Sequence, residues 1–171
     1  MIEQIEQWID QQLVNYSEQR VSCLGLPESV RGFFSDDFLS NAYFVETKDI
    51  PKPYFTKGIP GAVDFLSMQA QGITYKNTYF LLPDSPLSTH LHELVHVTQW
   101  HLLGGVGFIQ AYIAGVQQYG YRDSPLEEMA YSIQAHFESE GEFFHIPSHI
   151  EQLMAQKTTT EFLKSNKIAL S

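Results

Sequence analysis

The sequence predicts an α+β domain that is mostly helical, with a small twisted sheet ahead of a buried central helix. Apolar residues recur at helical spacing over most of the chain. Two short runs with strand composition, at residues 72–75 and 78–82, stand immediately before the most apolar helix. Ranges near 42–47 and 61–66 complete the predicted sheet. The 171 residues suit one domain, so we expect residues 1–171 to form a single unit.

Composition and charge narrow the possible partners. The chain has 20 acidic and 10 basic residues and a formal net charge of −10, which argues against nucleic acid. Cys23 is the single cysteine, so an internal disulfide and a cysteine zinc knuckle are excluded, and we expect it to be a buried apolar residue. We see neither a signal peptide nor a membrane span, so a cytoplasmic location without membrane contact is the default expectation.

The first half of the chain contains one clear helix and one clear strand. Apolar residues from Ile2 to Tyr16 recur with Glu and Gln between them, which predicts an amphipathic helix over about 2–20. The pattern over 23–41 is short and broken, with a turn of helix opening at Pro27. Residues 42–47 have strand composition, and prolines and glycines over 51–61 then indicate an irregular crossing.

The second half is predicted to be a hairpin followed by helices. Lys76-Asn77 joins the two strands, and Asn tolerates the left-handed backbone that a tight turn needs. Ser85-Pro86 opens the central helix, which we expect to end at the glycines of 104–107. Helices over about 108–119 and 124–138 follow, and a weaker one over 149–165 closes the chain.

The central helix contains the pattern His92-Glu93-Leu94-Val95-His96. On a helix, His92 and His96 lie about 40° apart on one face, so both imidazoles can reach a single Zn²⁺. Glu93 lies about 100° from His92, beside such an ion, where a carboxylate can take a proton from metal-bound water. The helix is apolar nearly all round, and histidines buried there would be costly without a metal or hydrogen bonds.

A zinc site of this kind needs a third protein ligand. His101 and His90 lie on the opposite side of the helix from His92, and no glycine bend separates His96 from His101. The helix that begins near Ser124 is the better source. Glu127 lies about 100° from the centre of its apolar stripe, at the border of the buried face, whereas Glu128 lies about 200° away in the solvent-facing sector. Glu127 is therefore the predicted third ligand.

Three segments together resemble small metallopeptidase domains of the gluzincin type, with the zincin-like fold. They are Ile73–Thr78, Leu87–Gln99 and Tyr121–Tyr131, and the resemblance covers roughly residues 50–135. It implies His92, His96 and Glu127 as zinc ligands and Glu93 as general base. Relatives of this kind accompany bacterial contractile injection systems and polymorphic toxins, which implies export by a specialised system.

The chain departs from that family at two positions. Met129 stands where the family usually has a second acidic residue. Tyr131 stands where better-known gluzincins have a carboxylate that bonds a ligand histidine, and a tyrosine hydroxyl is a weaker substitute. Peptidase activity is therefore less firmly predicted than metal binding.

The functional prediction is a zinc-dependent peptidase acting on a peptide or protein, with Thr78–Leu82 as the sheet edge that receives the substrate backbone. The alternative is a metal-stabilised binding or assembly domain of a secretion or toxin system, without catalysis. A peptide deformylase is disfavoured because that chemistry needs a cysteine ligand, and Cys23 has no suitable motif around it.

The candidate oxyanion donors are, in chain order, Tyr121, Arg122, Tyr131 and His136. A second metal site at His145 and His149 is disfavoured by Pro147 between them.

Overall fold

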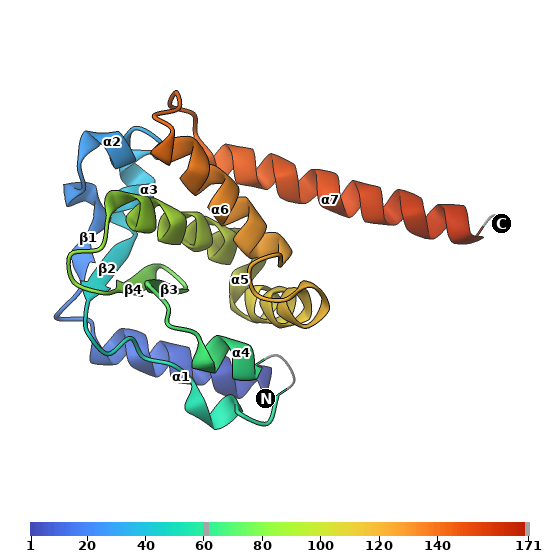
Figure 1. Ribbon diagram of the computed structural model, residues 1–171, viewed down its shortest axis with the longest axis horizontal. Coiled ribbons are helices and arrows are strands. Elements are labelled where there is room, and N and C mark those ends of the chain that lie inside the picture. The colour runs from blue at the N-terminus through green and yellow to red at the C-terminus, as the bar shows by residue number, and fades with distance from the viewer. Residues whose placement is uncertain (60–61, 170–171) are drawn as a thin grey trace.

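The chain folds into helices packed around a small sheet, as its sequence predicts. The computed structural model describes residues 1–59 and 62–169, without the side chains of Asp64 and of 158–169. The elements in order are α1 (Ile2–Asn15), β1 (Val21–Ser22), η1 (Cys23–Gly25), α2 (Glu28–Arg31), α3 (Asp36–Ser40), β2 (Tyr43–Glu46), η2 (Tyr54–Thr56), α4 (Ala62–Ser67), β3 (Gly72–Tyr75), β4 (Thr78–Leu81), α5 (Leu87–Tyr119), α6 (Pro125–Glu138) and α7 (Ile146–Ala169). Figure 1 shows α7 leading away from the rest of the molecule. The predicted α+β class is confirmed.

The four strands form a mixed sheet in the order β1-β2-β4-β3. β2 runs parallel to β4, whereas β1 with β2 and β3 with β4 are antiparallel. The parallel pairing is possible because the long connection from β2 to β3 lets the chain return beside β2. The prediction that the strand at 78–82 is a free edge is therefore wrong, since β4 has a neighbour on each side. The edge strand of the sheet on that side is β3, which pairs with β4.

The predicted strand at 61–66 is also wrong where the structure describes it. Residues 62–66 belong to helix α4, and residue 61 lies outside the described part. Ala62, Phe65 and Leu66 follow a spacing of three and four residues, which places them on one helical face, and Leu66 is buried. Val63 lies off that face and is 59% exposed. So short an apolar run does not distinguish a strand from a turn of helix.

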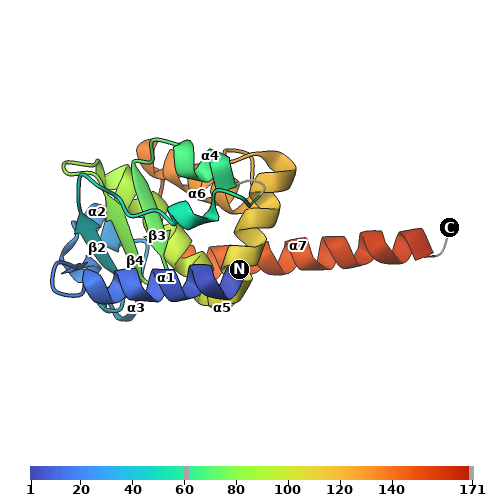
Figure 2. The same ribbon diagram turned by 90° about the horizontal axis from the view of Figure 1, so that it is seen from below.

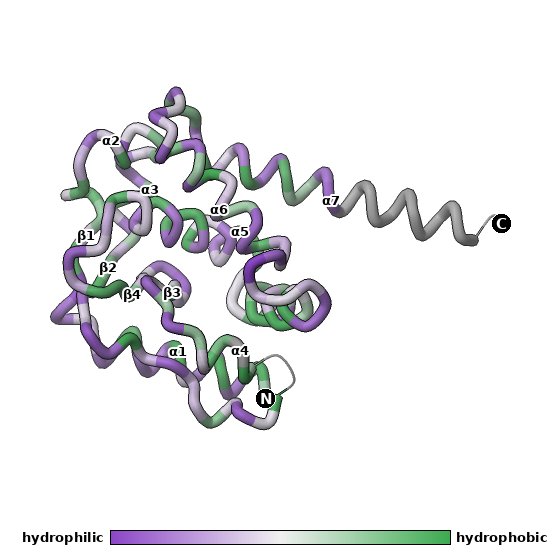
Figure 3. Tube along the Cα trace, viewed as in Figure 1, coloured by the Kyte–Doolittle hydropathy of each residue, from purple (hydrophilic) through white to green (hydrophobic). Residues whose placement is uncertain are grey.

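Helix α1 packs against the hairpin and α5. Figure 3 shows hydrophobic and hydrophilic residues alternating along it, and Ile5 and Ile9 are buried. The Lys76 Nζ atom lies 2.6 Å from Oδ1 of Asp10 and 3.1 Å from Oε1 of Glu6, which ties the hairpin turn to α1. The positive φ of this turn, 55°, belongs to Lys76 and not to Asn77, a correction to the prediction.

Helix α5 is the centre of the fold and consists of two arms. The predicted break at the glycines is confirmed, because Gly104 has φ 71° and ψ 171°, a left-handed conformation that favours glycine. The first arm lies across the page in Figure 1 and the second is seen nearly end-on, whereas Figure 2 shows the second arm along its length. The first arm packs against β3, β4 and α6. None of the described helices has the length and apolarity needed to cross a membrane.

Candidate metal centre

The first arm of α5 brings His92 and His96 together, as their spacing predicts. Their Nε2 atoms are 3.1 Å apart and the ring centroids 4.8 Å apart. Both side chains are buried, with 6% and 5% exposure, because α6 covers this face of the helix. Two imidazole nitrogens thus converge on one point inside the protein.

Each histidine is oriented by a glutamine amide. His92 Nδ1 lies 3.0 Å from Oε1 of Gln134, and His96 Nδ1 lies 2.8 Å from Oε1 of Gln99. An amide oxygen only accepts hydrogen bonds, so each Nδ1 carries the proton and donates. The Gln99 amide nitrogen in turn donates to the carbonyl of Leu126 at 2.9 Å. This arrangement leaves each Nε2 as the atom that can bind a metal.

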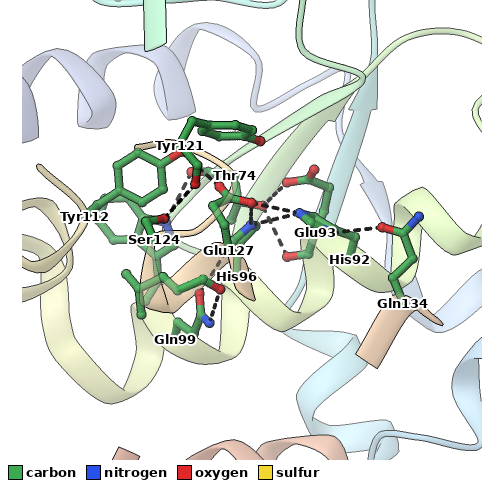
Figure 4. A network of polar contacts seen from close by, with 12 residues as sticks. Thr74, His92, Glu93, His96, Gln99, Tyr112, Tyr121, Ser124, Glu127 and Gln134 are labelled. Atoms are coloured by element: carbon green, nitrogen blue, oxygen red, sulfur yellow. Dashed lines mark hydrogen bonds and ion pairs between the residues drawn. The ribbon is translucent and has the colours of Figure 1, made fainter. Parts of the chain in front are cut away.

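Glu127 completes the cluster from α6, and Figure 4 shows its carboxylate directed at the two imidazoles. Its Oε2 atom is 3.3 Å from Nε2 of His92 and 3.4 Å from Nε2 of His96. The other oxygen, Oε1, accepts a hydrogen bond of 2.9 Å from the Tyr112 hydroxyl. Glu127 is 2% exposed, whereas Glu128 faces solvent, so the structure brings the predicted glutamate of the pair to the histidines.

Charge pairing dominates the electrostatics of this cluster. Burial alone would raise the pKa of Glu127, but the two imidazoles outweigh it and hold that pKa well below its usual range. Burial likewise opposes protonation of His96, but the Glu127 carboxylate raises its pKa to about 9. Without a metal, a proton on His96 therefore balances the charge of Glu127 at neutral pH.

The donor set fits a metal ion. Ligand atoms about 2.0–2.1 Å from a tetrahedral ion lie about 3.3–3.4 Å from one another. The three pairs of atoms here are 3.1, 3.3 and 3.4 Å apart. Oε2 of Glu127 is also buried with no hydrogen bond of good geometry and meets the two imidazoles through ion-pair contacts, so a cation between the three groups would satisfy it more fully. In the part of the chain that the structure describes, this is the group of acidic, His and Cys side chains able to hold a metal.

Glu93 lies beside the cluster, pressed against the edge strand. Its Oε2 atom accepts a hydrogen bond of 2.7 Å from the Thr74 hydroxyl. A Cβ atom on Gly72 would lie 2.5 Å from Oε1 of Glu93, so the carboxylate occupies space that only glycine leaves free. Burial raises the pKa of Glu93, although both histidines and Thr74 oppose the shift. Gly72 and Thr74 were not among the predicted site residues.

Tyr131 reaches the site through its ring and not through a bond to His92. The centroids of the Tyr131 and His92 rings are 4.6 Å apart. The Arg122 guanidinium lies over the Tyr131 ring, 3.4 Å from its centroid. The bond to His92 that the family resemblance assigned to position 131 is made instead by the amide of Gln134. Tyr121 is hydrogen-bonded to Tyr131, and burial raises its pKa, so its hydroxyl stays protonated. A catalytic role for Tyr131 stays a prediction.

The remaining histidines lie elsewhere. His101 is exposed and His90 is buried on the far side of α5, as predicted. His136 bonds the carbonyl of Glu142, and its ring packs against Phe33 and Phe144, so its role as an oxyanion donor stays a prediction. His145 bonds Ser148, and the His149 ring packs against Phe144. Among the described residues, His145 and His149 do not belong to a group of side chains able to hold a metal.

Several supporting residues had a signal in the sequence that the prediction did not use. Gln99 follows His96 by three residues on the same helical face, and Gln134 follows Glu127 by two turns on α6. Tyr112 and Thr74 had none, because each meets the site through tertiary packing. No family model matches the chain, and neither a curated protein nor a solved structure matches it.

Proposed function

We propose that this protein is a zinc-dependent peptidase whose ion is held by His92, His96 and Glu127. The observation that carries the proposal is the buried Oε2 of Glu127, which lacks a hydrogen-bond partner and faces two imidazole nitrogens. Two histidines and one carboxylate form a ligand set that suits zinc in hydrolases. When bound there, the ion would supply Lewis acidity that polarises a carbonyl group and acidifies a water molecule.

Glu93 would act as the general base. The Thr74 hydroxyl occupies Oε2, so Oε1 is the oxygen left to accept a proton from the attacking water. Burial makes this carboxylate more basic than one in solvent, which suits it both to take the proton and to return it to the leaving amine. Gly72 leaves the space in which the carboxylate can hold this position.

The substrate backbone would lie along β3. The register pairs Ile73 with Phe80 and Thr74 with Tyr79, and the carbonyl of Gln71 accepts from the Leu82 amide. By alternation, the amide and carbonyl of Gly72 then point away from β4, beside Glu93. The next outward carbonyl, that of Thr74, already accepts from the Trp100 indole at 3.1 Å. An added strand would therefore use the end of β3 that is next to the base.

Tyr121 is the best-placed donor for the oxyanion that forms during hydrolysis. It lines the same cavity as Glu93, His96 and Glu127, and burial keeps its hydroxyl protonated. Tyr131, which is hydrogen-bonded to it, would position the Tyr121 side chain. A preorganised hydroxyl donor of this kind stabilises developing negative charge in a site that excludes water.

The test is the Glu93→Gln variant, with Glu128→Gln on the exposed face of α6 as its control. The amide oxygen introduced at position 93 would still accept the Thr74 hydrogen bond, so we expect the fold and the zinc content to be kept. Activity on a mixture of peptides should fall by about 10²–10⁴-fold, the usual contribution of a general base, and the control should match the parent. Mass spectrometry of the digest and elemental analysis provide the two measurements.

Two results would contradict the proposal. Cleavage by Glu93→Gln at the parent's rate would remove Glu93 as the base. A zinc-loaded parent that cleaves no peptide would instead favour the alternative, a metal-stabilised binding or assembly domain.

A further inference from the structure

An apolar cavity opens directly from the candidate metal centre. Its volume is about 110 Å³, and Glu93, His96, Glu127 and Tyr121 form its polar end. The rest of the wall comes from elements far apart in the sequence, namely α1, the segment that contains α4, β3 and both arms of α5. For comparison, an engineered apolar cavity of about 150 Å³ holds benzene.

The apolar part of the cavity wall suits hydrocarbon. Ile5 and Ile9 of α1 line it, together with Trp100, Phe108 and Val116 from the two arms of α5. An unfilled apolar space of this size costs stability, because its walls lose the contacts that close packing would give. Such a space beside reactive side chains is the form that a ligand pocket usually takes.

The polar atoms of the wall are already engaged. The Tyr75 hydroxyl donates to the carbonyl of Pro51, and the Thr56 hydroxyl donates to the carbonyl of Pro53. The Tyr112 hydroxyl donates to Glu127. A polar or charged group that entered the cavity would therefore lose water without gaining a partner there.

Helix α4 forms one wall of this pocket. Ala62 and Phe65 face the cavity, and the Phe65 ring meets the Tyr112 ring edge-on at 6.0 Å between centroids. The Lys52 ammonium donates to the backbone carbonyls of Leu66 and Met68, at the carboxyl end of α4, and so fastens this segment. The position of Ala62 makes the pocket's size adjustable by one substitution.

We propose that this cavity binds one large apolar side chain, of the size of Leu, Met or Phe, in the substrate residue next to the cleaved bond. The proposal rests on the peptidase function proposed above, because it assigns the substrate class of the same site. An apolar side chain would displace no well-bonded group, and its backbone would remain near β3 and Glu93. Selectivity would then come from burial of that one side chain.

Cleavage of defined peptides that differ in one residue provides the first test. The zinc-loaded protein should favour Leu, Met or Phe over Ala or Asp by at least about tenfold in kcat/KM, as one well-filled apolar pocket allows. Ala62→Leu should narrow the pocket and lower kcat/KM for the Leu and Phe peptides by about tenfold, with zinc content unchanged. Val63→Leu is the matched control, since Val63 faces solvent next to Ala62. Val116→Ala should widen the pocket and move the preference towards Phe.

A binding measurement separates this inference from the peptidase function. N-acetyl-leucinamide and N-acetyl-phenylalaninamide should shift the methyl NMR signals of Ile9 and Val116 in the zinc-loaded protein, whereas N-acetyl-aspartamide should not. Cleavage without apolar preference, or a preference that Ala62→Leu leaves unchanged, overturns the pocket and leaves the peptidase intact. Binding of the apolar amides without any cleavage supports the pocket and counts against the peptidase. If the protein neither cleaves the peptides nor binds the apolar amides, both the pocket and the peptidase function are overturned.

Discussion

Two buried polar clusters lie on nearly opposite faces of the first arm of α5, and they differ in completeness. On one face, the Tyr79 hydroxyl donates to Nδ1 of His90 at 2.9 Å and accepts a weak bond from the Cys23 thiol at 3.6 Å. On the other, Oε2 of Glu127 makes no hydrogen bond of good geometry and meets the imidazoles of His92 and His96 at 3.3 and 3.4 Å.

This difference distinguishes a structural cluster from a candidate binding site, although both include histidines of the same arm of α5. The cluster of Cys23, Tyr79 and His90 satisfies its own polar groups, and burial raises the pKa of the Cys23 thiol to about 12, so the thiol is not a nucleophile at neutral pH. The cluster of His92, His96 and Glu127 instead directs two imidazole nitrogens and one carboxylate oxygen at a common centre. Burial of histidines alone therefore does not indicate a metal, whereas buried ligand atoms that converge at the spacing of a tetrahedral ion do.

The largest effect should follow removal of that carboxylate. Glu127→Ala removes one of three ligands, and we expect zinc affinity to fall by more than about 100-fold, the upper end of what loss of a residue that only orients a ligand costs. Glu128→Ala should leave affinity unchanged, and the parent should bind about one zinc per chain because it has one set of three ligands. Competition with a chelating dye at neutral pH measures all three. Equal affinity in the two variants would show that Glu127 is not a ligand.

The parts of this site that local geometry determines could be predicted from the sequence. The spacing of His92 and His96 fixes them on one helical face, and the border of the apolar stripe on α6 distinguishes Glu127 from Glu128. The glycine at 104 marks the end of the first arm because its φ is left-handed. The helical face on which each ligand stands follows from the period of 3.6 residues, in α5 for the two histidines and in α6 for Glu127.

The parts that depend on contacts between distant elements could not be predicted. The order of β2 and β4 follows from the path of a long connection, so the edge strand was assigned to 78–82 in error. Gly72 and Thr74 meet Glu93 only because β3 packs on α5. Residues 62–66 form too short an apolar run to show whether its period is that of a helix or of a strand.

An intermediate effect should follow loss of the amide that orients His92. Gln134→Leu removes the acceptor for Nδ1 of His92, so we expect zinc to bind about 10–100-fold more weakly, the usual cost of losing such a partner. Ser132→Ala, an exposed change on the same helix, should have no effect. The same dye competition measures both variants. An unchanged affinity in Gln134→Leu would mean that packing against Tyr131 alone fixes the ring of His92.

The smallest effect tests whether the two clusters are independent. Tyr79→Phe keeps the ring but removes the hydroxyl between Cys23 and His90, and it leaves Nδ1 of His90 without a donor. We expect the free energy of unfolding to fall by about 1–3 kcal/mol, the cost of leaving a buried polar group unpaired, as measured by urea denaturation. Tyr119→Phe, at a position 51% exposed, should stay within about 0.5 kcal/mol of the parent. Zinc affinity should be unchanged in both variants, because His90 points away from His92 on α5. Weaker zinc binding in Tyr79→Phe would show instead that the complete cluster helps to hold the first arm of α5 in the position that the metal centre requires.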